Sequence, residues 1–168
     1  MLFRSPQGQA NQWLEIDVEL DMAQKDKEGS KFADELTVKY YILLNNKSTT
    51  EDHKPTLLTG TVTHADIMFG KELHAGAFVS PQTLLRFFDG KVPNTFAQAI
   101  TDVGVTVSDS TGVIAQKAFK SQTRGDKGWW DSTEHFTEVT GRVLAKDATP
   151  FADLAWDYYL PTKPKAGL

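Results

Sequence analysis

The amino-acid sequence predicts a mainly β protein, folded as an antiparallel sandwich of two sheets with one short helix. Three observations support this fold class. Apolar and polar residues alternate strictly over residues 13–22, which is the period of a half-buried strand. More short apolar segments follow, separated by turn-forming residues, and a single stretch carries helical start and stop signals. Because strands and helices do not alternate, a sandwich is favoured over a parallel α/β sheet.

The composition is that of a single globular domain. The chain has 168 residues, of which 40% are hydrophobic and 24% are charged, and one domain commonly contains roughly 100–200 residues. We expect a sandwich domain over residues 12–161, between a flexible lead-in at 1–11 and a flexible tail at 162–168. The net charge of −4 and the scattered basic residues argue against a nucleic-acid partner. No apolar run approaches the roughly 18–20 residues of a membrane span, so no transmembrane segment is predicted.

The clearest strand covers residues 13–22. One face carries Leu14, Ile16, Val18, Leu20 and Met22, and the other carries Glu15, Asp17, Glu19 and Asp21. The four carboxylates could hold a calcium ion, but alternate side chains on one strand lie about 6.5–7 Å apart and no calcium-loop motif is present. The favoured interpretation is a solvated acidic face, and no metal is predicted.

Two longer strands follow in the first half of the chain. Residues 35–46 have one continuous apolar face, and Tyr41 and Leu43 make one end of the other face apolar as well. A strand with two apolar faces is expected to lie in the centre of a sheet. Residues 57–69 begin the next strand, which Gly70 is expected to turn.

Residues 81–88 predict the short helix. Ser80 suits the N-cap, Pro81 suits the first helical position, and Gly90 follows the end. The leucine and phenylalanine side chains of this segment need cover on nearly every side. We therefore expect the helix to plug one end or edge of the sheet core.

The second half of the chain predicts further strands. Residues 98–109 and 113–121 flank a turn at residues 110–112, whose glycine can adopt a positive φ, and together they predict a hairpin. The remaining strands are predicted at residues 129–136, 137–146 and 153–161, the last of which ends at a proline.

Trp129 and Trp130 are the main candidates for a contact site. In a strand, adjacent side chains point to opposite faces, so one indole would enter the core and the other would face outward. An outward indole could meet a partner protein or stack on a sugar, or it could lie against a loop as a structural residue. Asp126 and Asp131 make the surroundings polar. The predicted interaction or sugar-contact residues are Trp129, Trp130, Asp126 and Asp131.

His64 and His74 are candidates for acid–base chemistry or metal binding. Neither lies in an HExxH motif or a short pair of metal ligands, and the chain contains no GxSxG motif and no cysteine. His64 is best interpreted as a strand side chain with a satisfied hydrogen bond. We therefore predict no catalytic residue, no cofactor and no enzymatic activity.

Five segments carry a resemblance to a known family: WLEIDVELDM, YYILLNN, THADIMFGKELHAGAFVSPQTLLRFF, VTVSDSTGVIAQKAF and WDYYLP. Together they resemble an immunoglobulin-like protein associated with an Akkermansia-type pilus gene cluster in Gram-negative bacteria, over nearly all of residues 12–161. The resemblance implies an immunoglobulin-like β-sandwich with a non-enzymatic, exported role in filament assembly, surface adhesion or host interaction.

The same resemblance implies a periplasmic, outer-membrane-associated or extracellular location. The implied partners are other pilus or surface proteins, or a second copy of the chain. The alternative function is a carbohydrate-binding module with an exposed tryptophan, for which the partner would be a glycan. No site residue is carried over from the family.

Overall fold

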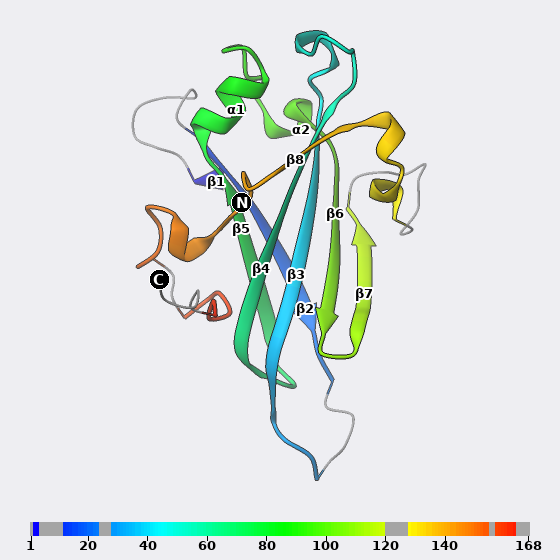
Figure 1. Ribbon diagram of the computed structural model, residues 1–168. Helices are drawn as coiled ribbons and strands as arrows, with labels where there is room; N and C mark the ends of the chain where they lie inside the picture. Colours follow the sequence, from blue (N-terminus) through cyan, green and yellow to red (C-terminus); the bar gives the residue numbers. More distant parts are fainter. Residues whose placement is uncertain (1, 4–11, 24–27, 120–127, 155–156, 164–168) are drawn as a thin grey trace, which may run out of the picture.

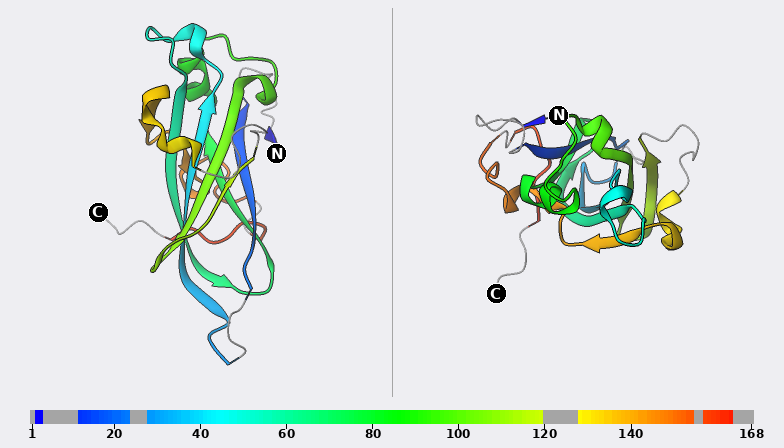
Figure 2. Two further views of the ribbon diagram at one scale, coloured as in Figure 1. Left: turned by 90° about the vertical axis from the view of Figure 1, so that its right-hand side faces the viewer. Right: turned by 90° about the horizontal axis from the view of Figure 1, so that it is seen from above.

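The computed structural model describes residues 2–3, 12–23, 28–119, 128–154 and 157–163. They form a two-layer β-sandwich, which confirms the predicted fold class (Figures 1 and 2). Sheet A has the strand order β1 (Leu2–Phe3), β2 (Trp13–Asp21), β5 (Glu72–Val79), β9 (Leu144–Ala145). Sheet B has the order β7 (Gly112–Ala118), β6 (Ile100–Asp109), β3 (Phe32–Leu44), β4 (Thr56–Met68), β8 (Thr137–Thr140).

The strand pairs are antiparallel except for β4 and β8, which run parallel. Two short α-helices, α1 (Pro81–Phe87) and α2 (Phe96–Ala99), lie at one end of the sandwich (Figure 1). The described 3₁₀ turns are η2 (Lys47–Thr49), η3 (Trp129–Asp131), η4 (Thr133–His135) and η5 (Lys146–Ala148).

The main core lies between the two sheets. Strand β3 supplies every second side chain to it: Leu36, Val38, Tyr40, Ile42 and Leu44 are all buried. This strand pairs with β6 on one side and β4 on the other, which confirms the central position predicted from its two apolar faces. Sheet A contributes the alternate positions of β2 and β5 to the same core.

The predicted helix is confirmed as α1. The Ser80 hydroxyl accepts a hydrogen bond from the Thr83 amide at 3.2 Å, and Pro81 occupies the first turn. Leu84 and Phe88 pack into the main core, so the helix covers one end of the sandwich as expected. Gly90 has a φ of 75°, and its amide donates to the Leu85 carbonyl at 2.7 Å.

The β6–β7 hairpin is also confirmed. Gly112 has a φ of 127°, a value that favours glycine, at the turn between the two strands. Gly70 likewise turns the chain between β4 and β5 with a φ of 74°. Residues 98–99, predicted as the start of a strand, belong instead to the single-turn helix α2.

Two predicted strands near the C-terminus are wrong. Residues 129–136 form the 3₁₀ turns η3 and η4 instead of a strand. In the 153–161 segment, the described residues form turns and one isolated bridge between Tyr159 and His74. The 137–146 segment divides into β8 in sheet B and β9 in sheet A, because a turn at Gly141, with a φ of 78°, redirects the chain from one layer to the other.

The chain ends contain described contacts. Leu2 and Phe3 pair with Leu14 and Trp13 as β1, within the segment expected to be a lead-in. In the segment expected to be a tail, Thr162 bridges His64, and the Lys163 amide donates to the Thr63 carbonyl at 2.8 Å. The rest of both segments lies outside the described residues.

Candidate functional site

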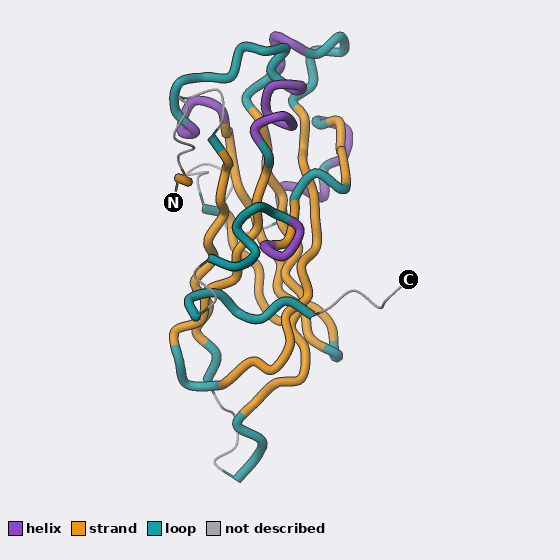
Figure 3. The backbone as a smooth tube through the Cα atoms, turned by 90° about the vertical axis from the view of Figure 1, so that its left-hand side faces the viewer, coloured by secondary structure: helices purple, strands orange, loops and turns teal. Residues whose placement is uncertain are grey.

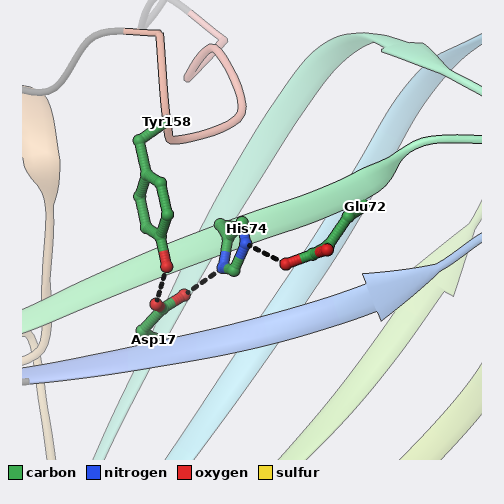
Figure 4. A network of polar contacts seen from close by, with 4 residues as sticks. All are labelled: Asp17, Glu72, His74 and Tyr158. Carbon is green, nitrogen blue, oxygen red and sulfur yellow. Dashed lines mark hydrogen bonds and ion pairs between the residues drawn. The ribbon is translucent and has the colours of Figure 1, made fainter.

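Four polar side chains form a network on the outer face of sheet A (Figure 4). Asp17 lies on β2, Glu72 and His74 lie on β5, and Tyr158 comes from the C-terminal segment. His74 is 3.0 Å from Asp17 through Nδ1 and 3.1 Å from Glu72 through Nε2. The Tyr158 hydroxyl donates to the second Asp17 oxygen at 2.7 Å, and its ring stacks on the imidazole with centroids 4.0 Å apart.

The network favours the charged form of His74. Burial lowers the pKa of His74, but the hydrogen bonds and charges of Asp17 and Glu72 outweigh burial and raise it. Both ring nitrogens face carboxylates, which accept hydrogen bonds, so both nitrogens donate. The hydrogen bond to Asp17 raises the pKa of Tyr158 to about 12. With neither nitrogen free to accept a proton, His74 acts as an ion-pair clamp and is not placed to serve as a general base.

The clamp fixes the C-terminal segment across the edges of both sheets. The Leu160 amide donates to the His74 carbonyl at 2.8 Å, and the Ala65 amide donates to the Pro161 carbonyl at 3.2 Å. Since His74 lies on β5 and Ala65 on β4, the segment ties sheet A to sheet B. Figure 3 faces this side, and the segment crosses the strands there before it reaches the C-terminus.

Aromatic packing supports the same attachment. Phe78 is buried on the outer face of β5, where its ring meets those of Phe151 and Tyr159 at centroid distances of 5.9 and 6.2 Å. Gly76 leaves the space that the Tyr159 ring occupies, because an added Cβ would lie 2.8 Å from that ring. The outer face of sheet A is therefore covered by aromatic side chains at one end and by the charged network beside them.

We expect the charge on His74 to make stability depend on pH. Because the folded pKa is raised above the ordinary histidine value of 6.5, the stabilisation is complete below that pH and is lost as pH rises through the folded pKa. Replacing His74→Gln should remove this part of the dependence between pH 6 and 9, measured as the midpoint of thermal unfolding. His53→Asn, at an exposed histidine with positive φ, is the control. An unchanged pH profile in His74→Gln would contradict the clamp.

His64 occupies a different environment. It is 1% exposed, and burial lowers its pKa, which favours the neutral ring. Its Nδ1 lies 3.3 Å from the Pro161 carbonyl, which can only accept. The predicted hydrogen bond is thus present at one nitrogen, while Nε2 has no partner in the described structure. Within the residues that the structure describes, no group of three histidine or carboxylate side chains could hold a metal ion.

The acidic face of β2 is not uniformly solvated, which corrects the sequence-based interpretation. Glu19 and Asp21 are exposed, but Glu15 is 4% exposed. Neither Glu15 carboxyl oxygen accepts a hydrogen bond from the described part of the chain. Burial is the largest cause and raises the pKa of Glu15 to about 7. The positive charge of the amino terminus opposes this rise, and the charge of Asp17 adds to it.

A groove follows the opposite side of the sandwich, between β2 and the β6–β7 hairpin. Its wide end has a volume of about 650 Å³ and is lined by apolar side chains that include Leu20, Met22, Val107 and Ile114. Two further cavities of about 560 and 220 Å³ continue it along β2 as far as Glu15. The three cavities share lining residues, so they form one surface. Figure 2 (left) faces this side, where β2 is blue and β7 is yellow-green.

The same side of the sandwich contains an open sheet edge. Strand β1 pairs with the outer edge of β2 only at Trp13 and Leu14. In the described structure, residues 15–21 pair with β5 on one side and with no strand on the other. Across the groove, Ile114 and Phe119 are among the large hydrophobic side chains that remain exposed. Backbone groups on an unpaired edge form a template for strand addition.

The two tryptophans are buried, so the expectation of one outward indole is wrong. Trp129 is 6% and Trp130 is 5% exposed. Trp130 stacks on Tyr41 with centroids 4.6 Å apart, and its ring covers Gly104. The pair belongs to a small hydrophobic cluster on the outer face of sheet B, which we call the tryptophan cluster: Tyr41, Leu43, Leu57, Trp129, Trp130 and Phe136.

The geometry of η3 explains this burial. In a 3₁₀ turn, neighbouring side chains need not point to opposite faces as they do on a strand, so both rings reach the same apolar patch. Asp131 is exposed, and Asp126 lies outside the described residues. Contact of Trp129, Trp130, Asp126 and Asp131 with a partner stays a prediction. The exposed indole on which that prediction depended is not observed.

Sequence reasoning missed the partners of His74. Glu72 lies two residues from His74 on one strand, so the two side chains share a face, and this spacing could have identified the pair. Asp17 and Tyr158 had no such local signal, because they lie 57 and 84 residues from His74 in the sequence. Only the pairing of β2 with β5 and the return of the C-terminal segment bring them together.

Among the described residues, no helix is long and apolar enough to cross a membrane. No curated protein matches the chain. A crystal structure of a protein from Akkermansia muciniphila is similar, with a TM-score of 0.76 and 21% sequence identity over 93% of this chain and 79% of that chain. At this identity the likeness concerns the fold. A model of a family of pilus-associated proteins matches residues 4–166, and the chain therefore belongs to that family.

Proposed function

We propose that this chain is a non-enzymatic, exported module of a pilus system, built on an immunoglobulin-like sandwich. Its role is to join other pilus or surface proteins in filament assembly, surface adhesion or host interaction. Family membership over residues 4–166 supports the association with pili. The proposed location is the periplasm, the outer membrane or the cell surface, where such partners are found.

The open edge of β2 beside the apolar groove is the observation that carries the proposal. Strand addition to an exposed edge is a common way for proteins to bind one another, with backbone hydrogen bonds for affinity and side-chain pockets for specificity. Natural sheets usually cover their edges or charge them, and the acidic residues of β2 charge this edge without covering it. Here one side of the sandwich is tied by the C-terminal segment, whereas the side at residues 15–21 is left open in the described structure.

The enzyme alternative receives no support from the geometry. His74 is held by two carboxylates, and His64 is buried with Pro161 at its one bonded nitrogen. The carbohydrate-binding alternative required an outward indole, but Trp129 and Trp130 are both buried. No specific observation favours either alternative over a protein-binding module.

The proposal is tested in the cells that produce the protein. We expect the protein to co-purify with sheared filaments, and deletion of its gene to reduce filament number in electron micrographs. A copy of the gene restored in the deletion strain should return the filaments, which controls for effects on neighbouring genes. A protein that remains in the cytoplasmic fraction, in cells with normal filaments after deletion, would overturn the proposal.

A further inference from the structure

We propose that the groove binds an extended basic segment of a partner protein, which adds as an antiparallel strand to the free edge of β2 and places a lysine or arginine against Glu15. This inference deepens the proposed function and rests on it only in taking the partner to be a protein. Geometry, charge and one unsatisfied buried group support it independently.

The geometry fits one added strand. Residues 15–21 of β2 have an unpaired edge in the described structure, long enough for a segment of about seven residues at roughly 3.4 Å each. Strand β1 already pairs antiparallel with this edge at Trp13 and Leu14, so the edge accepts a neighbour in that direction. Alternate side chains of an added strand would enter the apolar groove, and the others would lie beside the acidic face of β2.

The charges of the groove select a basic segment. Among the described lining residues, Lys117 is the one basic residue. Six acidic residues line the groove: Glu15, Asp17, Glu19, Asp21, Glu35 and Asp109. Asp17 is already held by His74 and Tyr158, and Glu35 pairs with Lys163. Glu15, Glu19 and Asp21 form no ion pair within the described residues. Glu19 and Asp21, which are exposed on alternate positions, are therefore available to cross-strand partners.

Glu15 gives the most specific indication. Glu15 lines the narrow end of the groove and is 4% exposed, and neither carboxyl oxygen has a hydrogen-bond partner in the described structure. An unsatisfied buried acid is costly, and natural proteins usually provide a partner for such a group. A cationic side chain on an added strand would supply it through a charge-assisted hydrogen bond.

The same charges disfavour a second copy docked edge to edge. Two β2 strands paired along this edge would place acidic side chains opposite acidic side chains, and like charges directly opposite are destabilising. The occupant is therefore a strand of different composition, with apolar and basic residues in alternation.

The test uses the full chain and a capped octapeptide of alternating valine and lysine. Binding is measured by titration calorimetry at pH 7 and low salt, and the site is located by amide hydrogen exchange. We expect saturable binding that weakens with salt, together with slower exchange in residues 15–21. A peptide of the same composition with its valines and lysines in two blocks should bind at least about tenfold more weakly, because it cannot separate its two faces.

Charge reversal provides the matched control. We expect Glu19→Lys with Asp21→Lys to weaken binding of the valine–lysine peptide by about tenfold and to favour a valine–glutamate peptide instead. Glu51→Lys with Glu134→Lys changes the net charge equally at exposed sites outside the groove, and should leave affinity unchanged. Glu15→Gln should weaken binding while the protein stays folded, as checked by circular dichroism.

Three outcomes would overturn the inference: equal binding of the blocked peptide, equal losses in the two charge-reversal variants, or exchange protection outside β2. The test is independent of the filament experiment. Peptide binding without co-purification with filaments would leave the groove assignment standing and remove the pilus role. Loss of filaments on gene deletion without peptide binding would support the pilus role and overturn the groove assignment.

Discussion

Replacing Trp130→Ala is expected to lower the free energy of unfolding by about 3–5 kcal/mol, the usual cost of truncating a buried tryptophan. The ring is 5% exposed, stacks on Tyr41 and packs edge-on against Trp129 at 5.5 Å. Its removal would leave a cavity in the tryptophan cluster and expose the outer face of β3. Urea denaturation followed by far-ultraviolet circular dichroism measures the loss.

Asp131→Ala, at an exposed position on the same turn, is the control and should change stability by less than about 0.5 kcal/mol. Gly104→Ala probes the same contact from the other side, since an added Cβ would overlap the Trp130 ring. Its cost should be much smaller in the Trp130→Ala background, because the clash is gone. A stable Trp130→Ala protein with altered binding would instead restore the contact-site prediction for this residue.

Replacing Glu15→Gln is expected to stabilise the protein at pH 8 by about 2 kcal/mol, an order-of-magnitude figure reduced for partial solvation. The pKa is raised from the ordinary glutamate value of 4.5 to about 7. The neutral acid is therefore favoured in the folded state, and this contribution is complete below pH 4.5 and lost as pH rises through 7. Glutamine keeps the size of the side chain but carries no charge at any of these pH values.

Unfolding free energies measured from pH 5 to 9 test this prediction. Wild type should lose stability as pH rises, and Glu15→Gln should lose less; Glu19→Gln, at an exposed position of the same strand, should follow wild type. Parallel curves for Glu15→Gln and wild type would show that the carboxyl group is solvated. If the prediction holds, Glu15 lowers stability in the free protein, as expected of a group retained for binding.

The β strands and the helix could be predicted because their signals are local. Alternation over residues 13–22 identified β2, the helix signals at Ser80, Pro81 and Gly90 identified α1, and the glycine at position 112 marked a hairpin turn. The apolar second face at Tyr41 and Leu43 also indicated a covered strand. This pattern did not reveal which residues cover the strand, because Trp129 and Trp130 lie almost ninety residues away in the sequence.

The same alternation misled the interpretation of the acidic residues. Glu15 and Glu19 have the same place in the pattern of β2, yet one is buried and the other is exposed. Periodicity assigns a side chain to a face of a strand, but the elements packed against that face determine its burial. The raised pKa of Glu15 could therefore not be predicted from the strand pattern.

Local sequence patterns were sufficient to predict the mainly β class, the central position of β3, the capped helix and the hairpin, because each depends on residues that are neighbours in the chain. The His74 clamp, the burial of the tryptophans, the burial of Glu15 and the open edge of β2 became visible in the folded structure alone. These features depend on contacts between distant segments and on which strand edges remain unpaired, and neither is encoded in a local pattern.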